Sequence, residues 1–245
     1  MAFELPENLA ILALFLDVDG TLVPIAADPA SVRPDPALPS LLAGASKRLG
    51  GALGIVSGRE IESIDRLTDG AVAYLAGSHG AEYRLGPGQA ILRPGPQPDL
   101  AALLAEIVRL TGAWPAVLIE PKRAGIAVHY RRAPQLAPEL RGLLETLLAR
   151  RTQADLSLLQ GDHVLEIRSP AHNKGEAVRR LMTAAPFQGR RPLFIGDDVT
   201  DEDGFAAAIE LGGAAIIVGD RRPTRATRQL GSPADVLRLL ARLAS

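Results

Sequence analysis

The chain begins with a run of apolar residues that stops at two aspartates. Residues 9–16 carry no charge and lead directly into Asp17-Val18-Asp19-Gly20-Thr21. A short, unbroken apolar run bounded by turn residues predicts a strand buried on both faces, as in parallel α/β sheets. Such sheets bind ligands beyond the carboxyl ends of their strands. Because Asp17 and Asp19 are two residues apart, which is the strand period, both carboxylates can point the same way at that edge.

The two aspartates need a partner there. Two ionised carboxylates held close together repel each other, and the pKa of one rises unless a cation lies between them. The stretch therefore predicts a divalent metal site, a pair that shares a proton, or both. A helix cap and a calcium loop are simpler alternatives. The calcium-loop template fails, because its twelfth position requires Glu and is Asp28 here.

Strands and helices alternate through the first and last thirds of the chain. This alternation predicts a doubly wound α/β fold with a parallel sheet. Polar or glycine residues follow the predicted strands, as in Ser57-Gly58-Arg59 and Gly196-Asp197-Asp198. The expected strands are residues 9–16, 53–56, 72–75, 192–195 and 214–218, and the expected helices are 37–49, 60–67, 174–184, 201–211 and the segment after Ser232.

The middle of the chain has a different pattern. A hairpin is expected over residues 81–93, and the Pro-rich segments 24–39 and 94–98 are typical of linkers. Two pairs of adjacent strands with two helices then predict a small α+β domain inserted into the fold. The predicted strands are 116–120, 125–130, 156–160 and 163–168, and the helices 99–112 and 137–151. We expect residues 1–93 and 170–245 to form the core and residues 94–169 to form the inserted domain.

Composition excludes several classes of function. The 245 residues carry a net charge of −1, so the chain lacks the basic surface of nucleic-acid-binding proteins. The absence of cysteine excludes disulfides, thiolate nucleophiles and cysteine-ligated metals, and four histidines are few for a histidine-rich metal cage. The first apolar run is too short to span a membrane. We therefore expect a cytoplasmic protein with neither a nucleic-acid nor a membrane partner.

Polar groups from four segments meet at the predicted sheet edge, namely Asp17 with Asp19, Ser57, Lys174, and Asp197 with Asp198. Three or four carboxylates can hold one Mg²⁺ together with water and phosphate oxygens. A hydroxyl, an ammonium and the N–H groups of helix N-termini can bind the other phosphate oxygens. A remaining carboxylate can attack phosphorus and form an aspartyl-phosphate. The simpler readings are a helix cap for Ser57, a solvated lysine for Lys174 and an acidic helix start for residues 197–203.

These motifs, in this order, are similar to those of the haloacid dehalogenase superfamily. Segments of the inserted domain narrow the resemblance to the trehalose-6-phosphate phosphatase family, whose cap signature is similar to Glu120-Pro121-Lys122, His129-Tyr130-Arg131 and Glu166-Ile167-Arg168. The resemblance covers nearly the whole chain. It implies a Rossmann-like core and a mobile α+β cap of the C2B type. Ser169 stands where the family usually has Pro, so the junction between cap and core is expected to differ slightly.

The resemblance also assigns roles to individual residues. It implies that Asp17 is the nucleophile and that Asp19 acts first as general acid and then as general base. Mg²⁺ would be held by Asp17, the backbone carbonyl of Asp19, and Asp197. The remaining roles fall to Asp198 and Asp201 as metal support, to Ser57, Gly58 and Lys174 as phosphate-binding residues, and to Glu120, Lys122 and Glu166 as sugar-binding residues. His129 and Tyr130 are expected to pack against or support these side chains.

The implied function is Mg²⁺-dependent hydrolysis of trehalose 6-phosphate in trehalose biosynthesis, carried out by a monomeric phosphoric monoester hydrolase. Its partner would be a small sugar phosphate. A related phosphatase acting on sucrose phosphate or mannosyl-phosphoglycerate would share these motifs. A phosphomutase would also share the core but would return the phosphoryl group to the sugar. A calcium-binding or sugar-sensing module with an inactive core is the alternative outside enzymes.

Overall fold

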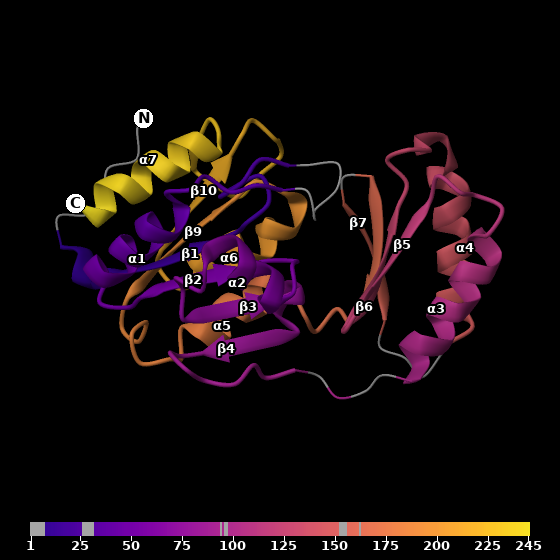
Figure 1. The fold of residues 1–245 in the computed structure, drawn as a ribbon, viewed down its shortest axis with the longest axis horizontal. Coiled ribbons are helices and arrows are strands. Elements are labelled where there is room, and N and C mark those ends of the chain that lie inside the picture. Colours follow the sequence, from indigo (N-terminus) through magenta and orange to yellow (C-terminus); the bar gives the residue numbers. More distant parts are fainter. Residues whose placement is uncertain (1–7, 26–31, 94, 96–97, 152–155, 162) are drawn as a thin grey trace. The chain divides into compact units, whose positions relative to one another are not determined.

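The computed structural model describes residues 8–25, 32–93, 95, 98–151, 156–161 and 163–245. It contains two compact units, unit 1 formed by Met1–Arg93 and Asn173–Ser245 and unit 2 formed by Pro94–His172 (Figure 1). Among the described residues, no helix combines the length and the apolar character needed to cross a membrane.

Unit 1 is built on a seven-stranded sheet in the order β11-β10-β9-β1-β2-β3-β4. Neighbouring strands are parallel except β3 and β4, which are antiparallel. The strands are β1 (Leu12–Leu16), β2 (Leu53–Val56), β3 (Tyr74–Gly77), β4 (Glu82–Leu85), β9 (Arg191–Gly196), β10 (Ala214–Val218) and β11 (Arg228–Leu230). All residues of β1 are buried, so the prediction of a strand covered on both faces is confirmed.

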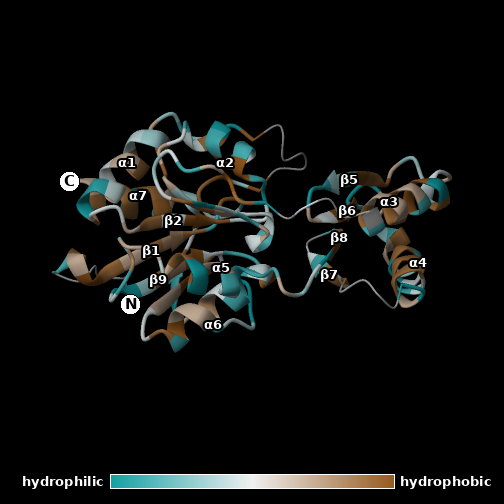
Figure 2. Ribbon diagram, turned by 90° about the horizontal axis from the view of Figure 1, so that it is seen from below, coloured by the Kyte–Doolittle hydropathy of each residue, from teal (hydrophilic) through white to brown (hydrophobic). Residues whose placement is uncertain are grey.

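Helices cover both faces of this sheet. Figure 2 shows α1, α2 and α7 on one side of the strands and α5 and α6 on the other. Apolar side chains of the two layers complete one core with the sheet, in which the rings of Phe15 and Phe187 stack at 5.1 Å. The helices are α1 (Leu38–Arg48), α2 (Ile61–Thr68), α5 (Lys174–Leu181), α6 (Glu202–Glu210) and α7 (Pro233–Ala244). The doubly wound α/β fold predicted from the sequence is confirmed.

The register of the central strands brings three polar loops to one edge. Leu16 of β1 pairs with Ile195 of β9 and with Ile55 of β2. The loops that follow these three strands therefore start at the same level of the sheet. Gly20, at a φ of 77°, then turns the chain away from β1.

Unit 2 is a four-stranded antiparallel sheet in the order β5-β6-β8-β7, with two helices on one face (Figure 1). Ile126, Val128, Leu165 and Ile167 face the helices and form the core of the unit with them. Since side chains alternate along a strand, the residues between them lie on the opposite face. The elements are α3 (Pro98–Thr111), β5 (Leu118–Lys122), β6 (Gly125–His129), α4 (Ala137–Ala149), β7 (Ser157–Gly161) and β8 (Val164–Arg168).

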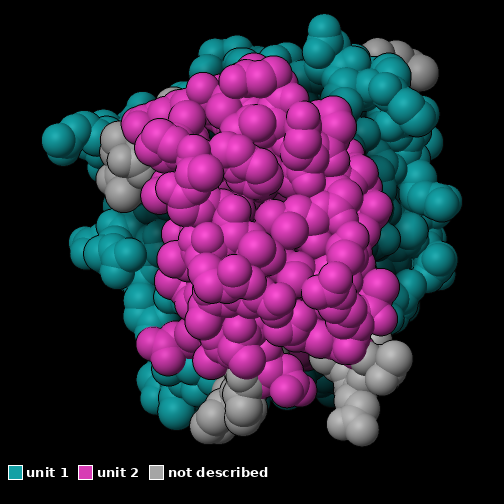
Figure 3. Space-filling view, turned by 90° about the vertical axis from the view of Figure 1, so that its right-hand side faces the viewer, with its two compact units in different colours: residues 1–93, 173–245 teal, residues 94–172 magenta. Residues whose placement is uncertain are grey.

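Unit 2 ends later than the sequence predicts. The expected junction lies between residues 169 and 170, whereas the units divide between His172 and Asn173 (Figure 3). The backbone N–H of His172 donates to the carbonyl of Ser169 at 3.1 Å, so the residues after β8 close a turn of their own. Asn173 instead caps α5, because its side chain accepts from the N–H of Glu176.

Two predictions of local structure are wrong, and one strand is missed. Residues 9–11 form a 3₁₀ turn capped by Asn8, so β1 begins only at Leu12. The hairpin over residues 81–93 is reduced to one bridge between Tyr83 and Leu92, while the other edge of β4 pairs along its whole length with β3. Strand β11 is not predicted, since it is short and polar. The Pro-rich segments 24–39 and 94–98 lie partly outside the described residues.

Candidate active site

Asp17 lies at the carboxyl end of β1 beside a buried lysine. Its side chain is buried, and its backbone N–H donates to the carbonyl of Ile195 at 3.0 Å. Lys174 is the first residue of α5, and its Nζ lies 2.9 Å from Oδ1 of Asp17 and 2.6 Å from Oδ1 of Asp201. Lys174 and Asp201 are also buried. Residues distant in the sequence thus form one buried ionic cluster.

Three carboxylates share this single ammonium. Asp17, Asp197 and Asp201 each place an oxygen within 4.8 Å of the others. Burial raises the pKa of Asp17 well above its ordinary value; Lys174 opposes this shift, whereas Asp201 and Asp197 add to it. Burial and the charge of Asp201 raise the pKa of Asp197 to about 7. Burial alone would lower the pKa of Lys174, but Asp17 and Asp201 raise it above its usual range.

The charge of the cluster fits a divalent cation. When all three carboxylates are ionised, the single ammonium of Lys174 balances one of them and two negative charges remain uncompensated. Asp17 and Asp197 each keep their Oδ2 without a hydrogen bond from a described residue, whereas Thr21 donates to Oδ1 of Asp197 at 3.3 Å. Carboxylate oxygens are the ligands that Mg²⁺ prefers, and a cation would relieve the repulsion that raises the pKa of Asp17 and Asp197.

Asp201 orients the loop that carries two other acidic residues. Its Oδ2 accepts from the backbone N–H groups of Asp197 and Asp198, both at 2.9 Å, while its Oδ1 faces Lys174. Both oxygens of Asp201 therefore already have partners. Asp198 lies outside the cluster and forms a capping box with Asp201 at the turn that precedes α6. Both residues thus act on the shape of the loop.

Arg59 holds Asp19 through two hydrogen bonds. Its Nε donates to Oδ2 of Asp19 and its Nη2 to Oδ1, both at 2.6 Å. The Asp19 side chain is 39% exposed and that of Arg59 only 9%. The backbone N–H of Arg59 also donates to Oγ of Ser57 at 3.2 Å. The sequence assigns Arg59 no role, and the signal that could have revealed one is its position directly after Ser57-Gly58 at a strand end.

A strained turn packs against the loop of Ser57. Residues 78–80 have φ values of 49°, 55° and 97°, although only the last is glycine. The N–H of His79 donates to the carbonyl of Ser57 at 2.9 Å. A Cβ on Gly58 would lie 2.5 Å from Nε2 of His79, so any other residue there would have to displace the imidazole. Left-handed backbone at a residue other than glycine costs about 1–2 kcal/mol and is concentrated at functional sites.

Arg221, to which the sequence gives no role, holds the loop of Asp197 and Asp198. Its Nε donates to the carbonyl of Asp197 at 3.1 Å and its Nη2 to that of Asp198 at 3.2 Å. It also pairs with Glu202 in the first turn of α6. Arg221 follows β10 as Asp197 follows β9, and these strands are neighbours. A polar residue just after a predicted strand is again the signal that could have identified it.

In unit 2, the three predicted sugar-binding residues lie on the sheet face opposite the helices. Glu120 and Glu166 both pair in register with Ala127 of β6, from opposite sides. Nζ of Lys122 lies 2.7 Å from Oε1 of Glu166. His129 joins them, with its Nε2 2.8 Å from Oε2 of Glu120. The structure therefore groups these side chains within unit 2.

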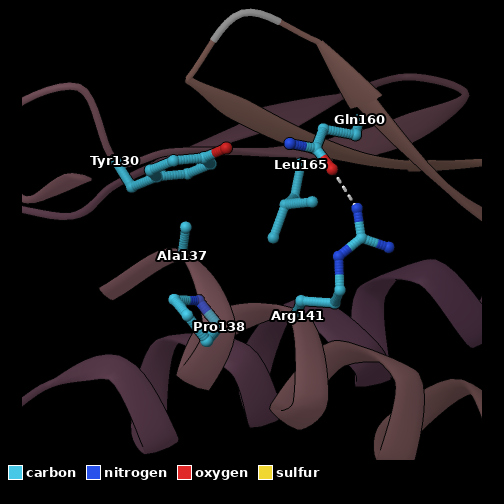
Figure 4. A pocket seen from close by; sticks show the side chains of 6 residues that line it. All are labelled: Tyr130, Ala137, Pro138, Arg141, Gln160 and Leu165. Atoms are coloured by element: carbon cyan, nitrogen blue, oxygen red, sulfur yellow. Dashed lines mark hydrogen bonds between the residues drawn. The ribbon is translucent and has the colours of Figure 1, made fainter. Parts of the chain in front are cut away.

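Unit 2 also contains a pocket of about 270 Å³ on the helix side of its sheet. Figure 4 shows the six side chains that line it, among them Tyr130 and Leu165. Leu165 belongs to the core between sheet and helices, so the sheet separates this pocket from the face of Glu120. Tyr130 is buried there and is a packing residue, one of the roles expected from the sequence.

Comparison with known proteins decides the family. The profile of the family described as trehalose-phosphatase matches residues 15–229. The chain belongs to this family. Over 235 residues it is 44% identical to a probable trehalose-phosphate phosphatase of Sinorhizobium fredii, covering 95% of this chain and 87% of that protein. It is 38% identical over 235 residues to the trehalose-6-phosphate phosphatase of Escherichia coli, and this match covers 94% of this chain and 86% of that protein.

A solved structure of the family extends the likeness to the fold. The C-terminal domain of the trehalose-6-phosphate phosphatase of C. albicans superposes with a TM-score of 0.83 at 26% identity, covering 96% of this chain and 92% of that one. The resemblance inferred from the motifs is therefore confirmed, together with the α/β fold of the haloacid dehalogenase superfamily. Members of the family are phosphoric monoester hydrolases, so the chain is a phosphatase.

Substituting Gly20 tests the geometry of the acidic cluster. A Cβ at this position would lie 2.0 Å from Oδ2 of Asp197, and the φ of 77° already disfavours other residues. Gly20→Ala should displace the Asp197 carboxylate and reduce phosphatase turnover about 100-fold, since a shift of about 1 Å has an effect of that size. Steady-state phosphate release measures this loss.

Gly70→Ala is the matched control. Gly70 also has a left-handed φ, 66°, but nothing lies within 4 Å of a Cβ there. It should therefore lose about 1–2 kcal/mol of stability, the backbone cost alone, and keep full turnover. Equal activity of the two variants would contradict the role given to the contact between Gly20 and Asp197.

Proposed function

We propose that this phosphatase hydrolyses trehalose 6-phosphate to trehalose and phosphate, the last step of trehalose biosynthesis. The observation that carries the chemistry is the buried Asp17 carboxylate, 2.9 Å from Lys174 within a cluster of three carboxylates. The substrate is supported by family membership and by the names of the relatives. The charged face of unit 2 supports a hydroxyl-rich ligand.

In the first half-reaction, Asp17 attacks phosphorus and the bond between phosphorus and the sugar oxygen breaks. Asp19 gives its proton to the departing oxygen, so trehalose leaves neutral and Asp17 becomes an aspartyl-phosphate. Lys174 and Ser57 bind the phosphoryl oxygens, helped by the backbone N–H of Gly58. Such donors stabilise the negative charge of the transition state. Lys174 is suited to this role because its ammonium already contacts Asp17.

In the second half-reaction, water attacks the phosphorus of the aspartyl-phosphate. Asp19, now ionised, takes a proton from this water, and the bond between Asp17 and phosphorus breaks. Phosphate leaves and both side chains return to their starting state. The carboxylate of Asp19 is half-exposed, which lets it meet both the sugar oxygen and water. In this structure Arg59 holds it, so one of these hydrogen bonds has to open during each cycle.

The acidic cluster is proposed to hold Mg²⁺. Asp17, Asp197 and the backbone carbonyl of Asp19 would be its protein ligands. Asp201, with Asp198, would keep the loop of Asp197 in place, in line with the hydrogen bonds that Asp201 accepts. The bound ion would supply a Lewis acid that neutralises charge on the phosphoryl oxygens.

Unit 2 is proposed to act as the cap that recognises the sugar. Glu120, Lys122 and Glu166 offer carboxylate acceptors and an ammonium donor on one face of its sheet. A disaccharide presents hydroxyl groups that both accept and donate hydrogen bonds. A site built from such partners rejects ligands that leave its polar groups unpaired. Unit 1 would then perform the reaction and unit 2 would select the sugar.

Phosphate release from trehalose 6-phosphate, with Mg²⁺ or with excess EDTA, tests the proposal. We expect turnover with Mg²⁺ and a loss of at least about 100-fold with EDTA, because the carboxylates would repel the phosphate without the cation. Sucrose 6-phosphate and glucose 6-phosphate, assayed in parallel, should be hydrolysed more slowly. Comparable rates on all three sugars would contradict the choice of substrate, and full activity in EDTA would contradict the metal.

The proposed cellular setting follows from the substrate. A sugar phosphate is charged and does not cross a bilayer unaided, so we place the reaction in the cytoplasm, where such esters are made. We also propose that the protein acts as a monomer.

A further inference from the structure

We propose that His129 is a positioning residue that fixes Glu120 for recognition of the sugar. The inference rests on the proposed function and gives a specific task to His129, which the sequence leaves as either a packing or a supporting residue. Its basis is a hydrogen bond of 2.8 Å between Nε2 of His129 and Oε2 of Glu120. Both residues lie in unit 2.

The strand register explains why these two side chains meet. β5 and β6 are antiparallel, with Glu120 opposite Ala127 and Leu118 opposite His129. Glu120 and His129 are therefore diagonal neighbours on the same face, a separation that long side chains can bridge. Ala127 presents only a methyl group to that face and leaves the path between them open. The imidazole is thus aimed at Glu120 by the sheet itself.

The hydrogen bond with His129 leaves the other carboxylate oxygen of Glu120 available for a ligand. Its side chain is 44% exposed, and Oε1 has no hydrogen bond to a described residue. The hydrogen bond from His129 lowers the pKa of Glu120 below its ordinary value, which keeps the group ionised as an acceptor for a hydroxyl. A carboxylate with one oxygen fixed and the other exposed is arranged to accept hydrogen bonds from a sugar.

Fixing Glu120 matters because a glutamate side chain is flexible. An exposed Glu loses considerable rotamer freedom when a ligand orders it, and this loss weakens binding. Histidine has only two side-chain torsions and stands on a central strand, so it can hold Glu120 before the ligand arrives. Glu166 is restrained in a comparable way by Lys122, 2.7 Å away across β6. The two carboxylates on either side of Ala127 are therefore each held by a basic side chain.

The test compares two substrates and two variants. His129→Ala should raise KM for trehalose 6-phosphate about tenfold, equivalent to about 1.4 kcal/mol, with kcat nearly unchanged. His129→Gln, which keeps an N–H donor, should recover most of the affinity. With p-nitrophenyl phosphate, which has no sugar, both variants should match the wild-type kcat/KM, and this also shows that they are folded. Gln160→Ala, on the other face of the sheet, should leave both reactions unchanged.

A double-mutant cycle separates positioning from direct contact. In a Glu120→Ala background, His129→Ala should have no further effect on KM, because the residue that it positions is missing. A second, additive loss would mean that His129 acts independently of Glu120 and would overturn the inference, as would an unchanged KM in His129→Ala alone. If the wild-type protein releases no phosphate from trehalose 6-phosphate, the proposed function itself fails. That result differs from an additive loss in the double mutant and from an unchanged KM in His129→Ala, which contradict only the role of His129.

Discussion

Asp17→Asn is expected to abolish turnover while leaving the fold intact. The amide cannot attack phosphorus, so phosphate release should fall by at least about 10⁴-fold, the scale seen when a nucleophile is removed. Burial raises the pKa of Asp17, which means that its ionised form is disfavoured in the folded protein. A neutral Asn of the same shape relieves this, so the melting temperature should not fall below that of the wild type.

Two measurements check this expectation. Acid quenching after mixing with phosphate-labelled substrate should trap label on the wild-type protein and none on the variant. Asp69→Asn is the control, since Asp69 is an exposed residue in the left-handed conformation at the end of α2, a position that Asn tolerates. It should change neither activity nor stability. Residual turnover above about 0.01% in Asp17→Asn would assign the nucleophile elsewhere.

Lys174→Met is expected to damage both stability and catalysis. It leaves the buried carboxylates of Asp17 and Asp201 without the ammonium that now lies within 3 Å of each. Breaking a buried ion pair in this way costs about 3–5 kcal/mol. Because Lys174 is the proposed phosphate-binding cation, its loss should also lower turnover at least about 10³-fold. Chemical denaturation and phosphate release measure the two effects.

The stabilisation of the Lys174→Met variant by Mg²⁺ is a second test of the charge balance in the cluster. Without the ammonium, the three carboxylates carry three uncompensated charges instead of two, so added Mg²⁺ should raise the melting temperature more than it does in the wild type. Lys47→Met is the control, because Lys47 is exposed in the last turn of α1. A Lys174→Met variant with wild-type stability would show that the lysine is not the main partner of these carboxylates.

The position of the acidic cluster could be predicted because it follows from strand topology. Apolar runs that end in polar residues indicated where β1, β2 and β9 stop, and parallel pairing then requires those ends to share an edge. The structure places Asp17, Lys174 and Asp197 together as this reasoning expects. Periodicity also located the helices, except for shifts of a few residues at their ends, where capping decides the boundary.

The partners of individual side chains could not be predicted from the sequence. Asp201 is expected to support the metal site, but spacing along the chain does not tell that its two oxygens pair with Lys174 and with backbone N–H groups. The pairing of Asp19 with Arg59 and the contact of Arg221 with two carbonyls depend on side-chain torsions and loop paths. Such details are not encoded in spacing along the chain. Strand β11 was missed because its three residues are mostly polar and exposed and therefore carry no apolar pattern.

The insertion of unit 2 into unit 1 has a consequence for the order in which the protein folds during synthesis. β1 lies in the centre of its sheet but pairs with β9, whose first residue, Arg191, is far along the chain. The first half of unit 1 must therefore wait for the ribosome to deliver its last strands. Unit 2 is one uninterrupted segment with its own core, and it can fold while the chain is still being made. The long-range pairing of β1 with β9 is then the slow step, because it closes a long loop.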